Sequence, residues 1–153
     1  MAIYLIDSSA LVKRYIKETG SAWVLGLFAS TSHEFFIAAI TSVEIVAAIT
    51  RRARGRSISA TDATMICNQL KSDLQTDYQI VEITESIITK GMVLAQTYGL
   101  RGYDAIQLAA GVAVNSLCIT HNLPTVTFVS ADNELNAAAL GEGLVIENPN
   151  SHP

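Results

Sequence analysis

The chain has 153 residues, of which 50% are hydrophobic and 16% are charged, and its net charge is −4. This length fits one domain, and the apolar share predicts a well-buried core with little disorder. The negative charge argues against a protein that simply coats nucleic acid, and no apolar run reaches the roughly 20 residues that span a bilayer. Because the start of the chain also lacks the basic segment of a secretion signal, we expect a cytoplasmic protein without membrane contact.

Residues 2–6 form an apolar run of mostly branched and aromatic side chains, which predicts a buried parallel strand. A helical pattern resumes only after residues 7–9, so Asp7 lies at the carboxyl end of the strand. Ligands bind outside such ends in open α/β sheets, which makes Asp7 a candidate for chemistry. The same residue suits the N-cap of the following helix, and this stretch alone leaves both roles open.

A second buried strand is expected at residues 35–40, and Glu44 follows it in the first turn of a helix. The helix dipole favours an acid at this place, which by itself explains Glu44. Its neighbours are nearly all apolar, however, so the carboxylate needs a partner or a cation. Arg51 lies two turns farther along the same helix face, where it could line a groove that leads from Glu44.

The middle of the chain predicts a helix over residues 60–76, a short strand at 78–83 and a helix from Thr84 to Tyr98. The inward side of this last helix is expected to carry Ile87, Ile88, Val93, Leu94 and Ala95. We expect the acids of the first of these helices, Asp73 among them, to face solvent. Asp104 then opens a helix that is apolar on all sides and therefore central to its domain. Arg101 and Gln107 flank Asp104 by one turn on either side, which makes a polar pocket at this helix start plausible.

A fourth strand is expected at residues 125–129, and it is followed at once by Ser130 and Asp132, which repeats the arrangement around Asp7. A short helix at 135–140 and a last strand at 144–146 complete the pattern. We assign residues 1–149 to a single domain and residues 150–153 to a loose C-terminal tail. Strands that alternate with helices predict an α/β fold with a doubly wound sheet.

Three of the acids thus stand at or just after strand ends and the fourth opens a central helix, so the fold would gather them at one sheet edge. Four carboxylates in one place would repel one another, and a hard divalent cation relieves this repulsion. Mg²⁺ or Mn²⁺ suits a site of carboxylates without His or Cys, whereas Zn²⁺ does not. Such an ion activates water and braces a phosphodiester for in-line displacement. The chain shows neither a nucleophile and base pair nor a phosphate-binding P-loop.

Four motifs occur in the following order: Asp7-Ser8-Ser9 after an apolar strand, Glu44 after Thr41-Ser42, Gly102-Tyr103-Asp104-Ala105-Ile106-Gln107-Leu108-Ala109, and Val129-Ser130-Ala131-Asp132 before Leu144-Val145-Ile146-Glu147-Asn148-Pro149. With these motifs the chain resembles a PIN domain, specifically the VapC toxin group, over about residues 2–149. The resemblance implies a three-layer α/β/α fold with a central, mostly parallel five-stranded sheet.

The resemblance also implies a function. It assigns the catalytic and metal-binding acids to Asp7, Glu44, Asp104 and Asp132, and a hydroxyl near the metal to Ser8 or Ser130. The expected activity is a Mg²⁺- or Mn²⁺-dependent endoribonuclease. The expected assembly is a homodimer held in check by a small VapB-like antitoxin, as in a type II toxin–antitoxin pair.

Two clusters of basic residues could guide the RNA backbone to this site. They supply the expected RNA-binding rim: Lys13, Arg14, Lys17, Arg51 and Arg52. A solvated helix face is the ordinary explanation of such clusters. The alternative function is a catalytically silent binding module, whose acids hold a structural cation or receive an arginine from a partner. A phosphate-transfer enzyme with Asp7 as nucleophile is disfavoured, since the second acid of that pattern is replaced by Ser9.

Overall fold

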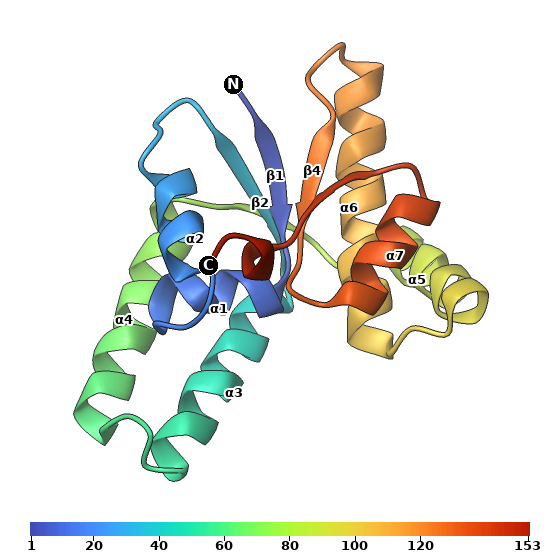
Figure 1. The fold of residues 1–153 in the computed structure, drawn as a ribbon. Helices are drawn as coiled ribbons and strands as arrows, with labels where there is room; N and C mark the ends of the chain where they lie inside the picture. Colours follow the sequence, from blue (N-terminus) through green and yellow to red (C-terminus); the bar gives the residue numbers. More distant parts are fainter.

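The computed structural model describes residues 1–153 as strands and helices that alternate along the chain (Figure 1). In chain order the elements are β1 (Ile3–Ile6), α1 (Ser8–Tyr15), α2 (Ser21–Phe28), β2 (Glu34–Ala38), α3 (Thr41–Arg54), α4 (Ala60–Thr76), β3 (Gln79–Val81), α5 (Glu85–Tyr98), α6 (Gly102–Thr120), β4 (Val126–Val129), α7 (Asn133–Gly141), β5 (Val145–Glu147) and the short 3-10 helix η1 (Pro149–Ser151). No helix combines the length and the apolar character that crossing a bilayer requires.

The five strands form one sheet in the order β3-β2-β1-β4-β5, and every neighbouring pair is parallel. The predicted five-stranded α/β sheet is therefore confirmed, and it is wholly parallel. β1 lies at the centre, with Ile6 in register with Val129 of β4. Because all strands run the same way, their carboxyl ends share one edge of the sheet. The segments that begin with Asp7 and Ser130 leave this edge side by side.

Helices cover both faces of the sheet, and each face has its own hydrophobic cluster. α5, α6 and α7 pack on one face against strand residues such as Leu5 and Phe128. α1 to α4 lie on the other face, where Ile6, Ile37 and Val129 are buried. Successive strand residues alternate between the two clusters, as strand geometry requires. Figure 1 shows the resulting three layers, with the α3–α4 hairpin reaching beyond the sheet.

Two expectations about individual acids and apolar residues are wrong. The sequence predicts an exposed Asp73, whereas the structure buries it at 5% exposure beneath Tyr15, whose hydroxyl donates to it. The reason is that α4 turns this side toward α1 and its cationic Arg14, 3.6 Å away. On α5 the sequence predicts Ile88 and Val93 to face inward, but both are exposed because α6 covers a different stripe of that helix.

The end of the chain is also more ordered than a loose tail. η1 packs beside α2, where Gly20 has a φ of +85° and approaches the backbone of Pro149 so closely that no Cβ would fit. His152 stacks on Trp23 with ring centroids 4.5 Å apart, and its Nε2 lies 2.9 Å from Oε2 of Glu147. Residues 149–152 therefore pack against α2.

Candidate active site at the carboxyl edge of the sheet

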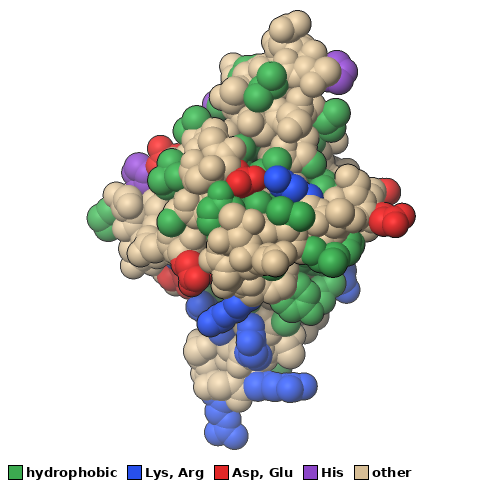
Figure 2. All heavy atoms as spheres, turned by 90° about the vertical axis from the view of Figure 1, so that its right-hand side faces the viewer, with side chains coloured by type: hydrophobic (Ala, Val, Ile, Leu, Met, Phe, Trp, Pro, Cys, Tyr) green, Lys and Arg blue, Asp and Glu red, His purple; other side chains and the backbone are tan.

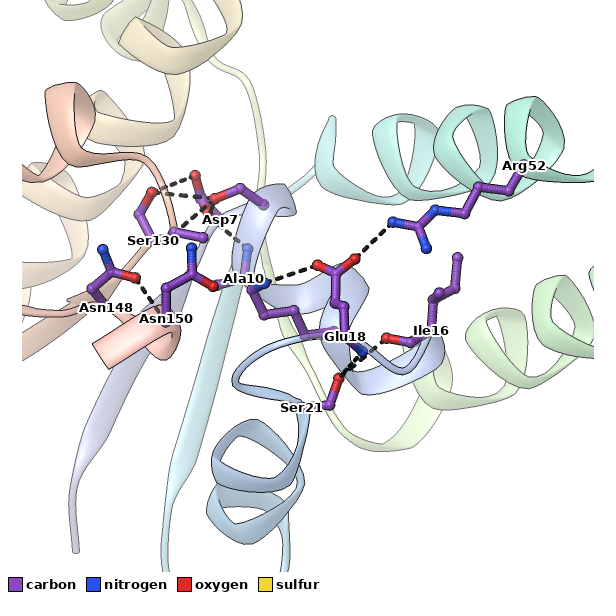
Figure 3. Close-up of polar contacts among 12 residues, drawn as sticks. Asp7, Ala10, Ile16, Glu18, Ser21, Arg52, Ser130, Asn148 and Asn150 are labelled. Carbon is purple, nitrogen blue, oxygen red and sulfur yellow. Dashed lines mark hydrogen bonds and ion pairs between the residues drawn. The ribbon is translucent and has the colours of Figure 1, made fainter. Parts of the chain in front are cut away.

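Asp7 follows β1 directly and is buried, with 3% of its surface exposed. Its Oδ1 caps α1 by accepting from the Ala10 amide at 3.1 Å and from Ser9 Oγ at 2.7 Å. Its Oδ2 accepts from Ser130 Oγ at 2.9 Å, and Ser130 directly follows β4, the strand beside β1 (Figure 3). Asp7 therefore caps α1 and also lies at the candidate site, so the two roles that the sequence leaves open do not exclude each other.

Burial raises the pKa of Asp7 from its ordinary value near 3.8 to about 7. The hydrogen bonds from Ser9 and Ser130 lower the pKa of Asp7, but by less than burial raises it. The negative charge of Asp104 raises the pKa of Asp7 further. In the absence of a cation, Asp7 therefore binds a proton near neutral pH.

Glu44 lies in the first turn of α3, where its Oε1 accepts two hydrogen bonds. Ser8 Oγ donates to it at 2.7 Å, and Gln107 Nε2 donates at 3.0 Å. Gln107 comes from α6, is 2% exposed and also reaches Thr41 Oγ1 at 2.9 Å. Oε2 of Glu44 takes part in no hydrogen bond, so one oxygen of this carboxylate is fixed and the other is free to bind a ligand.

Asp104 and Asp132 approach the same edge from α6 and α7. Burial raises the pKa of Asp104 above its ordinary value, and the charge of Asp132 raises it further. The charge of Glu44 also raises the pKa of Asp104, whereas the charge of Arg101 lowers it. Asp132 caps α7 through Oδ1, which accepts from the amides of residues 134 and 135, while its Oδ2 makes no hydrogen bond. Asp104 is thus within electrostatic reach of each of the other three predicted acids.

The four acids do not, however, form a ready-made ligand cage. No three His, Cys, Asp or Glu side chains lie in an arrangement that could hold an ion directly. Mg²⁺ keeps several of its waters and binds proteins through one or two carboxylates, so a set of separated oxygen donors fits it. The mutual repulsion that raises the pKa of Asp104 is what a divalent cation would relieve. The donor set fits a hydrated hard cation and does not fit Zn²⁺.

A family model of the PIN domain matches residues 4–139 of the chain. The chain belongs to the PIN domain family. A search of curated proteins finds no match. Among solved structures, FitAcB from Neisseria gonorrhoeae is similar with a TM-score of 0.65 and 16% identity, over 95% of this chain and 97% of the other.

Two further solved structures are similar to the chain. VapBC2 from Rickettsia felis, bound to a DNA fragment from its promoter, matches with a TM-score of 0.60 and 16% identity over 95% of this chain and 98% of the other. VapC20 from Mycobacterium tuberculosis, a toxin that cleaves the sarcin–ricin loop, matches with a TM-score of 0.63 and 13% identity over 88% of this chain and 94% of the other. At these identities the likeness shows the fold, and the predicted PIN resemblance is confirmed.

Three of the five basic residues predicted for RNA binding are engaged within this PIN domain. Lys13 is buried and its Nζ lies 2.8 Å from Glu18, which Arg52 also contacts at 2.7 Å (Figure 3). Arg14 pairs with Asp77 at 2.6 Å and lies over an aromatic ring of α2. Lys17 and Arg51 are exposed and form no ion pair. The free positive charge near the acids is therefore smaller than the sequence count indicates.

A groove of about 770 Å³ runs along α3, and Glu44 is the one of the four acids that lines it. Its walls are formed by Ser8, Ser9, Val12, Ile40, Val43, Glu44, Ile45, Ala47, Ala48, Arg51, Arg101 and Tyr103. The predicted groove from Glu44 to Arg51 is thus present, although its floor is mainly apolar. Figure 2 shows basic side chains gathered toward the end of the molecule that carries the α3–α4 hairpin. The groove connects the acidic edge with this basic end.

The structure adds site residues that the sequence analysis does not assign. Ser9 Oγ donates to Asp7 and accepts from the Ala131 amide at 2.9 Å, so it joins the segments after β1 and β4. Asn136 supports the same place through its Nδ2, which donates to the Ser130 carbonyl at 2.8 Å. Ser9 stands in the first motif and could have been found there, whereas Asn136 gives no signal because it lies inside an ordinary helix pattern.

Proposed function

We propose that this PIN domain is a metal-dependent endoribonuclease and the toxin of a type II toxin–antitoxin pair. The observation that carries the proposal is the electrostatic coupling of acids from separate elements at one sheet edge: Asp104 interacts unfavourably with Asp7, Glu44 and Asp132. Such repulsion destabilises a fold, and acids perturbed in this way cluster at functional sites. Membership of the PIN family and similarity to toxin structures support a nuclease.

Asp104, Glu44 and Asp132 would hold Mg²⁺ or Mn²⁺, since each has at least one carboxylate oxygen that no hydrogen bond uses. The bound ion would activate a water and neutralise charge on the phosphodiester. The protein's part is to keep the acids in place. Ser8 fixes Glu44 and Ser130 fixes Asp7, which gives the two proposed hydroxyls near the metal a definite role.

RNA binding would use the groove along α3. We propose Lys17, Arg51 and Arg52 as contacts to the RNA backbone, because their side chains are at least partly exposed. Lys13 and Arg14 are only 6% and 16% exposed in their ion pairs and would support α1 instead, whereas Arg52 stays 38% exposed beside Glu18. Phosphate contacts of this kind make affinity depend on salt.

We also propose an assembly and a location for this chain. The proposed partner is a small VapB-like antitoxin, which the similarity to FitAcB and VapBC2 supports. The proposed assembly is a homodimer, and the proposed location is the cytoplasm. An arginine of the antitoxin placed among the four acids would satisfy them much as a metal does. Co-expression with a short neighbouring reading frame tests this: we expect a stable complex that suppresses cleavage.

The test of the function is cleavage of a fluorescent single-stranded RNA of mixed sequence during a Mg²⁺ or Mn²⁺ titration. We expect cleavage that rises with metal and stops in excess chelator. Asp104→Asn should abolish it with an unchanged circular dichroism spectrum. Exposed Asp62→Asn on α4 is the matched control and should cleave normally. Full activity of Asp104→Asn, or of the wild type in chelator, would refute the proposal.

One observation favours a second candidate, a catalytically silent binding module. No three acids are close enough to cage an ion, so a partner arginine is also a suitable occupant. Turnover separates the two candidates, because a silent module binds RNA or an antitoxin peptide without ever producing fragments.

A further inference from the structure

Tyr103 is the one tyrosine of this chain without a polar or aromatic partner. The chain has five tyrosines. Tyr15 and Tyr78 share a hydrogen bond, Tyr98 donates to Glu142, and Tyr4 stacks on an aromatic ring of β2. Tyr103 has neither kind of contact, and 67% of its surface is exposed. Its ring is therefore mostly open to solvent and contributes little to the packing of the domain.

The position of Tyr103 relates it to the acids. It precedes Asp104 in the first turn of α6 and forms part of the groove wall together with Glu44 and Ser8. Arg101 and Arg51 line the same groove. An exposed ring and two guanidinium groups thus surround the entrance to a strongly anionic edge, where a polyanion needs positive charge to approach.

We propose that Tyr103 and Arg101 form a subsite for one unpaired nucleotide of a single-stranded RNA. The base stacks on the phenol ring and the neighbouring phosphate pairs with the guanidinium, which places the adjacent phosphodiester over the acids. Bases of single strands stack on exposed aromatic rings, whereas bases within a duplex are not free to do so. The inference rests on the proposed ribonuclease function and adds the two residues that position an unpaired strand beside the acids.

The groove chemistry favours RNA over a second copy of the chain as the occupant of Tyr103. A second apolar hollow on the far side of Tyr103 is lined by Ile88, Gly91, Met92, Ala95, Gly102, Ala105 and Ile106, and contains no charged residue. The hollow next to the acids has two arginines instead. The phosphates of an RNA strand can pair with both guanidinium groups, and the uncharged hollow offers them no such partner.

The experiment measures kcat/KM on fluorescent single-stranded RNA for Tyr103→Leu and Tyr103→Phe. We expect Tyr103→Leu to lose about tenfold, within the range of one stacked base, and Tyr103→Phe to recover most of the loss. In the wild type, an abasic nucleotide at one position beside the cleaved bond should cause a similar loss. The same abasic substrate should cause no further loss in Tyr103→Leu. Leu117→Ala, at the other end of α6 and equally exposed, is the control.

A second arm tests the phosphate contact. Arg101→Gln should lower the slope of log affinity against log salt by about 0.7, the value for one contact to a single strand. Lys71→Gln on the exposed side of α4 should leave the slope unchanged. Sedimentation at the assay concentration accompanies both arms.

The outcomes separate the inference from the function on which it rests. If the wild type cleaves RNA and Tyr103→Leu cleaves equally well, the subsite is wrong and the nuclease stands. If the loss in Tyr103→Leu comes with a change in oligomeric state, Tyr103 contacts a second copy and the subsite is again wrong. If the wild type cleaves no RNA with any metal, the proposed function fails first and the subsite falls with it.

Discussion

Gln107 Nε2 lies 3.0 Å from Oε1 of Glu44, so a buried amide of α6 fixes a carboxylate of α3. The same nitrogen lies 3.0 Å from Ser8 Oγ and 2.9 Å from Thr41 Oγ1. Gln107 Oε1, in contrast, is buried without a partner. An unsatisfied buried carbonyl destabilises a fold, which indicates that this residue serves the site more than the stability of the core.

Gln107→Leu tests this relationship. The variant removes the contacts of Nε2 with Glu44, Ser8 and Thr41 together with the unsatisfied carbonyl, so we expect the free energy of unfolding to fall by about 1 to 3 kcal/mol. Affinity for Mn²⁺ and the cleavage rate should each fall by about 10- to 100-fold, as for other residues that orient a ligand. Exposed Gln96→Leu is the matched control. A large loss of stability with unchanged Mn²⁺ affinity would show that Gln107 is a core residue only.

Asp7 should make the stability of the metal-free protein depend on pH. Its pKa is about 7 in the folded state and 3.8 as an isolated side chain, so the folded state holds the proton more tightly. Stability is therefore greatest below pH 4 with respect to this group and declines as pH rises to about 7, by up to about 1.4 kcal/mol per pH unit.

Asp7→Asn isolates this contribution from that of all other acids. The amide can still accept from Ala10 and can donate to Ser130, so the fold should persist. Urea unfolding at pH 5 and pH 7.5 should show a smaller decline in the variant than in the wild type, and the variant should be the more stable at pH 7.5. Equal pH dependence of the two proteins would contradict the burial of an isolated carboxyl at this position.

Glu18 holds two cations at once and should matter for stability. Glu18→Gln leaves the buried ammonium of Lys13 without a counter-charge, which should lower the free energy of unfolding by about 3 kcal/mol. Lys13→Met removes the buried charge and keeps the aliphatic chain, so its effect should be within about 1 kcal/mol. Thermal denaturation of both variants measures the difference. If both behave alike, Lys13 is hydrated in solution and available to RNA.

Arg51 should contribute to RNA affinity through charge alone. Its side chain is exposed, unpaired and on the groove wall, so Arg51→Gln should weaken binding and reduce the salt slope by about 0.7. Fluorescence anisotropy with RNA at several salt concentrations measures this, with Lys71→Gln as the control. An unchanged salt slope would show that RNA does not bind along α3.

The sequence predicts the elements of this fold well because their signals are local. The apolar run before Asp7 and the one before Ser130 are readable as buried strands, and a parallel sheet then brings both ends to one edge. The placement of the acids follows from this rule and requires no knowledge of side-chain contacts. Ser9 and Asp7 lie two residues apart, and their hydrogen bond is likewise a local feature.

Contacts between distant elements could not be predicted in this way. Asp73 looks like a solvated charge on its own helix, yet it is buried because partners approach from another element. These partners are Arg14 and Tyr15 of α1. Arg52 of α3 likewise pairs with Glu18 in the loop after α1. Charge alone does not reveal such pairs, since one sequence gives no information on which helix faces meet.

Mn²⁺ binding to the wild type, measured by isothermal titration calorimetry alongside Glu44→Gln, Asp104→Asn and Asp132→Asn, tests the central claim most directly. The account predicts one saturable event in the wild type that releases protons near pH 7 and is at least tenfold weaker in each variant. Binding of equal strength in all four proteins, or no binding to the wild type, would contradict a shared metal site at this edge of the sheet.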